Sequence, residues 1–281
     1  MSGAQKVDAV IIGAGISGMY QLHKLRKIGL TVKVYEGGTG VGGTWYWNRY
    51  PGARFDSESV SYGYSFSEEL LQEWNWKERF SPQPDNLEYL EYVADKFDLR
   101  KDIQFSTRVT SSHYGEEGNE WTVTTDDGKS IKCQFLITAV GVLSTPFVPE
   151  IKGLSSFQGA SWHTANWPKE HVGFEGKKVG VIGTGATAVQ LIQEVAKTVG
   201  QLTVFQRTAN FCKPLGNSLI SDDEQEDIKK NYPKIFQRCR ETFGSFLADF
   251  EKKSAFDVTP EEREARYEEL WNEPGFGFWL G

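Results

Sequence analysis

Two glycine-rich turns in the sequence have the spacing that binds a dinucleotide. The first, Gly13-Ala14-Gly15-Ile16-Ser17-Gly18, follows an apolar run and begins a helical pattern. Such a turn lets the backbone approach a pyrophosphate, which the amide groups and positive end of the helix then bind. Glu36 ends the next apolar run, 18 residues after Gly18, and its carboxylate accepts hydrogen bonds from a ribose 2′-hydroxyl but repels a 2′-phosphate. This turn therefore predicts a site for FAD or NAD and not for NADP; the alternative is a tight structural turn.

The second turn, Gly183-Thr184-Gly185-Ala186-Thr187-Ala188, differs in the residues that come after its second strand. The usual acidic residue is absent, and Gln206-Arg207-Thr208 stands at that point. The guanidinium of Arg207 and the hydroxyl of Thr208 can bind a 2′-phosphate through charge-assisted hydrogen bonds, which predicts NADP in preference to NAD. The alternative interpretation of Arg207 is a solvated surface charge. One site of each kind indicates that NADPH reduces a bound flavin.

A third segment, from Gly42 to Asp56, combines glycines, aromatic residues and a proline turn. These residue types can bring backbone close to an isoalloxazine ring, with Arg54 and Asp56 presented beside it. An aromatic core segment explains the same residues equally well. The residues alone leave both interpretations open.

The elements that must position these segments follow from the apolar periodicity. The first turn lies between a strand at 7–12 and a helix at 17–28, and Gly29 ends that helix before a strand at 32–35. The second turn repeats the pattern, with a strand at 179–182, a helix to about 199 and a strand at 202–205. Further elements are expected as a helix at 85–97, a strand at 103–110, a hairpin of 121–125 with 130–133 around Asp127-Gly128, a buried parallel strand at 135–140, and a helix that begins with Thr259-Pro260-Glu261-Glu262.

Two strand-helix-strand units about 170 residues apart predict the fold class. It is α/β, with two Rossmann-like dinucleotide-binding domains for FAD and NADP and a helical insertion. The second unit has fewer parallel strands than a doubly wound half needs, so both domains are expected to be incomplete. The predicted organisation is residues 1–142 as the first part of the FAD domain, 143–176 as an interdomain linker, 177–214 as the first part of the NADP domain, and 215–281 as the helical insertion.

Composition excludes several classes of protein. The formal net charge of −7 disfavours nucleic acid and anionic lipid as partners. No apolar run approaches the ~18 residues of a membrane span, and Asp8 interrupts the only stretch that imitates a signal peptide. We therefore expect a cytoplasmic protein. Neither a disulfide framework nor a metal site is predicted from the spacing of Cys133, Cys212 and Cys239 and of His23, His113, His163 and His171.

The motifs resemble those of Baeyer-Villiger monooxygenases, flavoproteins that insert one oxygen atom of O2 beside a ketone carbonyl to give an ester or lactone. The two glycine turns occur in the order of that family, and the Gly42 to Asp56 stretch matches its pattern Gly-Gly-x-Trp-x4-Tyr-Pro-Gly-x3-Asp. The most specific match is residues 157–168, which fit Phe-x-Gly-x3-His-x3-Trp-Pro at every defined position: Phe157, Gly159, His163, Trp167 and Pro168. The resemblance covers all 281 residues.

The resemblance implies a role for each matching residue. Arg54 and Asp56 are expected near the nicotinamide as catalytic residues, and His163 is expected to couple domain movement to cofactor binding and not to act as an acid or base. The residues implied for NADP are Gly183, Thr184, Gly185, Ala186, Thr187, Ala188, Arg207 and Thr208. Those implied for FAD are Gly13, Gly15, Ile16, Ser17, Gly18, Glu36, Thr44, Trp45 and Asp56, with Tyr62 and Val109 resting on position alone.

The resemblance also implies the reaction. NADPH reduces FAD, O2 adds to give a flavin C4a-peroxide, and this peroxide, kept deprotonated, attacks the ketone. A cation beside the flavin stabilises the negative charge. In the family this is an arginine positioned by an aspartate; Asp56 matches the aspartate, and no residue here matches the arginine. The expected partners are therefore a ketone, O2 and a missing carboxy-terminal half, without which we expect the chain to be inactive.

Three alternatives stay open. A related flavin monooxygenase oxygenates amines or sulfides when the peroxide is protonated, but the signature at residues 157–168 argues against it. A flavin disulfide reductase is less favoured because adjacent redox cysteines are missing. A non-catalytic dinucleotide-binding fragment fits the expected absence of a second half.

Overall fold

The protein forms two compact units. The computed structural model describes residues 5–275 and 277–280. One unit combines Met1–Tyr50 with Asn86–Val172, and the other combines Pro51–Asp85 with Gly173–Gly281. The segment that follows Tyr50 thus groups with the second glycine turn.

The first unit contains a six-stranded mixed sheet in the order β3-β2-β1-β6-β5-β4. The four strands β3, β2, β1 and β6 run parallel, whereas β5 and β4 continue the sheet antiparallel. The strands are β1 (Gln5–Ile12), β2 (Val32–Tyr35), β3 (Ile103–Gln104), β4 (Val109–Gly115), β5 (Glu120–Thr125) and β6 (Ser130–Thr138). The predicted hairpin at Asp127-Gly128 is confirmed, and Gly128 has φ 78°, which a non-glycine residue rarely adopts.

Two strand predictions in this sheet are wrong in part. The strand predicted at 103–110 is divided into β3 and β4, because Ser106 has φ 51° and the amides of Ser106 and Thr107 donate to the carbonyls of Gly38 and Glu36. The predicted strands at 130–133 and 135–140 instead form one strand, β6. Its distal part pairs parallel with β1 as predicted, but it is not buried, since Phe135 is 50% exposed.

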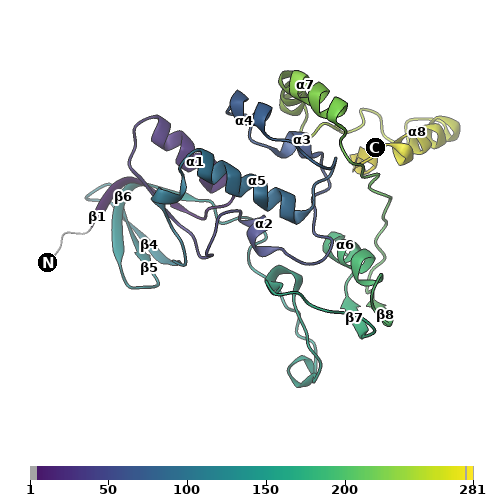
Figure 1. Cartoon of the computed structure of the whole chain (residues 1–281), viewed down its shortest axis with the longest axis horizontal. Helices are drawn as coiled ribbons and strands as arrows, with labels where there is room; N and C mark the ends of the chain where they lie inside the picture. The colour runs from purple at the N-terminus through teal and green to yellow at the C-terminus, as the bar shows by residue number, and fades with distance from the viewer. Residues whose placement is uncertain (1–4, 276, 281) are drawn as a thin grey trace. The chain divides into compact units, whose positions relative to one another are not determined.

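Helices cover one face of this sheet. Figure 1 shows α1 and α5 lying along the same side of the strands. The helices are α1 (Ile16–Lys27), α2 (Thr44–Trp47) and α5 (Gln83–Lys96). Apolar residues at helical spacing, such as Leu22 of α1 and Leu90 of α5, are fully buried. The segment between β6 and residue 178 contains only two short 3₁₀ helices, η2 (Leu154–Ser156) and η3 (Thr164–Asn166).

The second unit repeats the strand-helix-strand pattern on a smaller scale. Among the described residues its sheet has two parallel strands, β7 (Lys178–Ile182) and β8 (Gln201–Phe205), joined by α6 (Ala186–Val195). The other helices of this unit are α3 (Ser59–Tyr62), α4 (Glu68–Glu73), α7 (Asp222–Glu241), α8 (Pro260–Asn272) and the 3₁₀ helix η4 (Gly277–Leu280). The 3₁₀ helix η1 (Arg100–Asp102) belongs to the first unit. The predicted start of a helix at Thr259 is confirmed: a capping box joins Thr259 and Glu262. The α/β fold class is therefore confirmed.

Candidate dinucleotide-binding sites

The first glycine turn is held too tightly for side chains. It connects β1 to α1, and the Gly13 amide donates to the Tyr35 carbonyl. A Cβ atom on Gly13, which has φ 103°, would lie 2.5 Å from the Ala139 carbonyl oxygen, and one on Gly18 would lie 1.9 Å from the Gly13 oxygen. No side chain caps α1 at Gly15, and Ile16 and Ser17 form its first turn. The turn thus presents backbone at a helix N-terminus, as an anion site requires.

Glu36 lies directly beside this turn, where β2 ends. Glu36 is buried, with 7% of its surface exposed. One carboxylate oxygen accepts a hydrogen bond from the Ala14 amide at 2.8 Å and the other from the Gly38 amide at 2.7 Å. Because each carboxylate oxygen has two lone pairs, each can still accept one hydrogen bond from a ribose hydroxyl.

The Gly42-Gly43 pair packs against the first turn. A Cβ atom on Gly43, which has φ 53°, would lie 2.8 Å from the Cα of Gly15, and the Gly42 amide donates to the Ala14 carbonyl. Thr44, which is exposed, and Trp45, which is buried, directly follow this glycine pair and so lie next to the first glycine turn. Val109 begins β4 and packs on the core cluster of the sheet. Tyr62, in the second unit, stacks on Phe55 with ring centroids 4.1 Å apart.

Tyr46 fixes the loop between β2 and α2. Its ring fills the space beside Gly38 and Gly40, where Cβ atoms would lie 2.7 and 3.2 Å from it. Its hydroxyl oxygen accepts from the Thr39 amide at 2.9 Å and from Lys169 Nζ at 2.9 Å. Burial by itself would raise the pKa of Tyr46, but the hydrogen bonds from Lys169 and Thr39 outweigh this and lower it.

The second glycine turn is more open. Gly183 has φ 103° and its amide donates to the Phe205 carbonyl, but Cβ atoms on Gly183 and Gly185 would meet nothing within 4 Å. No side chain caps α6, whose first turn holds Ala186, Thr187 and Ala188. Arg207 and Thr208 follow β8 and are exposed. Asn210 Nδ2 donates to the Thr184 carbonyl at 2.6 Å and Gln206 Nε2 to the Thr184 hydroxyl at 3.1 Å.

Arg54 and Asp56 lie in the second unit with different surroundings. Arg54 Nη1 donates to Glu78 Oε2 at 3.0 Å and to the Phe80 carbonyl at 3.1 Å, and its side chain is 25% exposed. Asp56 is exposed, and within residues 5–275 and 277–280 its carboxylate has no hydrogen bond or ion pair. The Asp56 carboxylate is therefore free to pair with a cation, whereas the Arg54 guanidinium already has protein partners.

The signature segment is organised by its own side chains. His163 Nδ1 accepts from the Ala165 amide at 3.2 Å and so caps η3. The Phe157 ring lies where a Cβ atom of Gly159 would be, 2.5 Å away. Trp162 and Trp167, which precedes Pro168, have ring centroids 6.0 Å apart.

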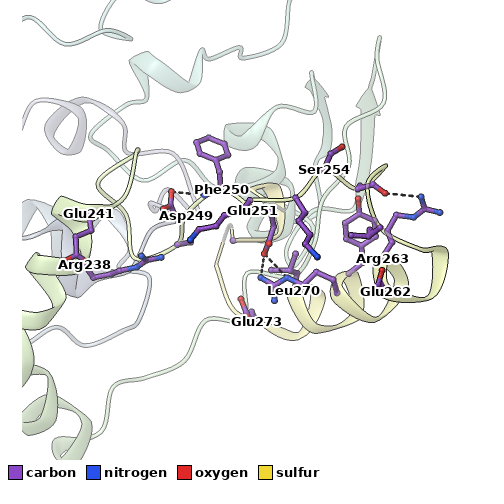
Figure 2. A pocket seen from close by; sticks show the side chains of 18 residues that line it. Arg238, Glu241, Asp249, Phe250, Glu251, Ser254, Glu262, Arg263, Leu270 and Glu273 are labelled. Atoms are coloured by element: carbon purple, nitrogen blue, oxygen red, sulfur yellow. Dashed lines mark hydrogen bonds and ion pairs between the residues drawn. The ribbon is translucent and has the colours of Figure 1, made fainter.

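A cavity of ≈ 970 Å³ lies beside α8 within the second unit (Figure 2). Its lining carries acidic and basic side chains in equal number, and two of the lining residues, Arg266 and Glu251, form an ion pair. It holds none of the predicted site residues. Among the described residues, no cluster of His, Cys, Asp and Glu could hold a metal ion, and no helix is both long and apolar enough to cross a bilayer.

Comparison with known families decides where this arrangement belongs. The model of the family described as flavin-binding monooxygenase-like matches residues 4–213. The chain belongs to the flavin-binding monooxygenase-like family.

Relatives of this flavin-binding monooxygenase-like protein include ketone monooxygenases and one protein named as a Baeyer-Villiger monooxygenase. This chain is 45% identical to a cyclohexanone 1,2-monooxygenase of Acinetobacter sp over 99% of its own length and 51% of the relative. It is 44% identical both to a Baeyer-Villiger monooxygenase of Pseudooceanicola batsensis, over 97% of this chain and 50% of the relative, and to a phenazine N-monooxygenase of Lysobacter antibioticus, over 96% and 50%. The resemblance inferred from the sequence is confirmed. The chain spans about half the length of the curated relatives it matches.

Solved structures agree with this family-level result. An oxidized steroid monooxygenase bound to NADP is 50% identical, with a TM-score of 0.94 over 98% of this chain and 53% of that chain. The protein called OTEMO, in complex with FAD and NADP, is 45% identical, with a TM-score of 0.94 over 99% of this chain and 53% of that chain.

Sequence reasoning missed the residues that hold this protein's site segments in place. Lys169, Glu78, Gln190 and Asn210 contact segments far away in the sequence. Local periodicity carries no signal for such contacts. Only the position of Lys169, directly after the Trp167-Pro168 pair of the signature, could have drawn attention to it.

Proposed function

We propose that this chain forms the FAD- and NADP(H)-binding part of a Baeyer-Villiger monooxygenase that converts ketones to esters or lactones with NADPH and O2. The observation that carries the proposal is the pair of glycine turns, each at an uncapped helix N-terminus, with an acid beside one and Arg207-Thr208 beside the other. The steroid monooxygenase and OTEMO, whose structures contain NADP or FAD with NADP, support it by similarity.

The proposed FAD site uses the backbone of the first glycine turn for the pyrophosphate and the two remaining lone pairs of Glu36 for the ribose. The close packing at Gly13, Gly18 and Gly43 supports this fit. A Cβ atom at any of these positions would collide with backbone atoms, so only glycine allows the turn to adopt this conformation. Bound FAD would supply electron storage and the activation of O2. The further residues proposed are Gly15, Ile16, Ser17, Thr44, Trp45, Asp56, Tyr62 and Val109.

The proposed NADP site uses the exposed Arg207 and Thr208 for the 2′-phosphate. The hydrogen bonds from Gln206 and Asn210 to Thr184 connect this phosphate-binding end to the glycine turn. The turn residues Gly183, Thr184, Gly185, Ala186, Thr187 and Ala188 would contact the pyrophosphate.

We propose that Asp56 holds a cation, the arginine of a segment that this chain does not contain. Its exposed carboxylate supports this role. A second half of the protein and a ketone are accordingly proposed as partners. His163 would hold the signature segment through its cap on η3. The domain boundaries and the cytoplasmic location predicted from the sequence stay predictions.

The test is the visible absorption spectrum of the purified chain, with and without NADPH under anaerobic conditions. We expect a flavin spectrum that NADPH bleaches faster than NADH. Arg207→Ala should lower the rate with NADPH by about tenfold while leaving NADH unchanged, and Arg240→Ala, an exposed arginine of α7, should behave as the wild type. A chain that binds FAD but bleaches equally with both nucleotides would contradict the assignment of the second site.

A second candidate function is oxygenation at nitrogen. The 44% identity to a phenazine N-monooxygenase favours it. Expressed with a carboxy-terminal half from a relative, the protein should be offered cyclic ketones, tertiary amines and aromatic nitrogen heterocycles. Ester or lactone formation supports the Baeyer-Villiger proposal, and N-oxide formation alone supports the alternative. Nucleotide binding without NADPH oxidation by that longer protein would favour a non-catalytic role.

A further inference from the structure

Gln190 of α6 binds the backbone of Arg54 with both ends of its amide. Its Nε2 donates to the Arg54 carbonyl at 2.9 Å, and the Arg54 amide donates to its Oε1 at 3.4 Å. The two residues are separated by 136 positions and lie in the same compact unit. The contact therefore joins the helix of the second glycine turn to the segment that presents Asp56.

The same helix approaches this segment a second time, through its backbone. Gly52 has φ 82°, and a Cβ atom on it would lie 2.6 Å from the Gln190 carbonyl oxygen and 3.0 Å from Glu194 Cγ. Only glycine permits both this conformation and this distance. The backbone from Gly52 to Arg54 therefore packs directly against α6.

Residues outside α6 also hold this segment. The Gln83 amide donates to the Ala53 carbonyl at 2.7 Å, and Arg54 pairs with Glu78 at 3.0 Å. Phe55 and Ser57 are 8% and 6% exposed. Asp56 is consequently an exposed residue between two buried neighbours, and its position depends on what fixes Arg54.

We propose that Gln190 is a positioning residue that couples occupancy of the second dinucleotide site to the placement of Asp56. The inference rests on the proposed function for its ligand, NADP. Gln190 lies one helical turn after Ala186, the first residue of α6, and on the same side of the helix. A nucleotide bound at the N-terminus of α6 stabilises the first turn of the helix. Because the Gln190 side chain is hydrogen-bonded to the Arg54 backbone, the motion of Arg54 then decreases as well. The coupling needs no movement of the helix, only a loss of its fluctuations.

The experiment is hydrogen-deuterium exchange on the whole 281-residue chain, with and without NADP+. Gln190→Met keeps the length of the side chain and removes both hydrogen bonds. Gln193→Met is the matched control, because among the described residues the Gln193 side-chain amide donates only to the Val189 carbonyl of its own helix. The Ser59 amide, which donates to the Arg79 carbonyl, is an internal reference in the same segment.

Without nucleotide, we expect exchange in the peptide that contains Arg54 to be about three- to tenfold faster in Gln190→Met than in the wild type. Exchange at Ser59, and everywhere in Gln193→Met, should be unchanged. NADP+ should slow exchange at Arg54 in the wild type and in Gln193→Met but not in Gln190→Met. A purely structural role for Gln190 would not make protection by NADP+ depend on it. Gln190→Glu, which keeps the acceptor, should lie between the two.

Equal exchange at Arg54 in the wild type and in Gln190→Met overturns the inference. So does equal protection by NADP+ in both, when calorimetry shows that both bind the nucleotide; the proposed function would then survive. Failure of the wild-type chain to bind NADP+ by calorimetry overturns the proposed second site and the coupling together. If Gln190→Met does not fold, the same comparisons with Gln190→Glu decide.

Discussion

Lys169 Nζ lies 2.9 Å from the hydroxyl oxygen of Tyr46 and 4.9 Å from the centre of its ring. Lys169 directly follows the signature segment, and Tyr46 packs in the glycine-rich loop that follows Glu36. One exposed lysine therefore connects the linker to the loop of the proposed FAD site within the first unit. The contact combines a hydrogen bond with a cation-π interaction.

Replacing Lys169 should change the titration of Tyr46. In Lys169→Met we expect the pKa of Tyr46 to rise, because burial then acts with only the Thr39 hydrogen bonds opposing it. The difference in ultraviolet titration between this variant with and without Tyr46→Phe isolates the one phenol. In the native chain, the lowered pKa means that ionisation of Tyr46 adds stability only as alkaline pH is approached, and none at neutral pH.

The same variant should lose about 1 kcal/mol of unfolding free energy at pH 7, since a hydrogen bond and a cation-π contact are removed. Lys152→Met, at an exposed position elsewhere in the linker, is the control. An unchanged Tyr46 titration in Lys169→Met would show that the lysine does not bind the phenol in solution.

The two glycine turns should differ in their tolerance of a methyl group. Gly18→Ala places a Cβ atom 1.9 Å from the Gly13 oxygen, so we expect a loss of about 3 kcal/mol in unfolding free energy and of FAD binding. The equivalent position of the second turn already carries Ala188. Ala188→Gly should cost only about 0.5–1 kcal/mol, from backbone entropy. Urea unfolding of both variants measures the contrast, and equal losses would refute the difference in packing.

Glu36→Gln should weaken both the first unit and its proposed ligand site. The glutamine keeps one acceptor oxygen, but its NH2 group faces the amide of Ala14 or Gly38, leaving a buried donor unpaired. We expect a loss of about 1–3 kcal/mol in unfolding free energy and reduced FAD affinity by fluorescence titration. Glu117→Gln, an exposed glutamate of the β4–β5 turn, should change neither. Full FAD affinity in Glu36→Gln would exclude the carboxylate as the ribose acceptor.

Acid titration should show a lowered pKa for the carboxylate of Asp127, in the hairpin between β5 and β6. Hydrogen bonds from Lys129 and Thr125 lower its pKa from 3.8 to about 2. A lowered pKa in the folded state contributes stability above the ordinary pKa, and this contribution is lost as pH falls from about 4 through about 2. Carboxyl NMR should give a midpoint near 2, which Lys129→Met raises and Lys101→Met leaves unchanged. A midpoint of 3.8 in the native chain would mean that the hairpin contacts are absent in solution.

The sequence predicted local structure well and distant contacts poorly. The limits of β2 were predicted to the residue, since four alternating residues followed by Glu36 form an unambiguous pattern. The strand predicted at 103–110 was divided because Ser106 and Thr107 bond to the Glu36 loop, a contact that periodicity does not encode. The glycine turns and Glu36 were predicted because their residue types and spacing alone indicate a dinucleotide-binding turn.

The neighbours of the candidate site residues could not be predicted in this way. The partners of Arg54, which are Glu78, Phe80 and Gln190, lie 24 to 136 positions away. Phe135 fits the pattern of a buried strand, yet half of its surface is exposed, because nothing in the described chain covers it. A periodic pattern predicts which side of a strand is apolar, but not whether a partner layer is present.

The small sheet of the second unit has a practical consequence. β7 and β8 pair only with each other among the described strands, and Ile182 and Phe205 are 66% and 56% exposed. Short apolar strands with open edges are templates for strand addition from another molecule. Stored at high concentration, the isolated chain should therefore self-associate through this sheet, and lysine substitutions along the edge of β8 should delay precipitation without affecting the first unit.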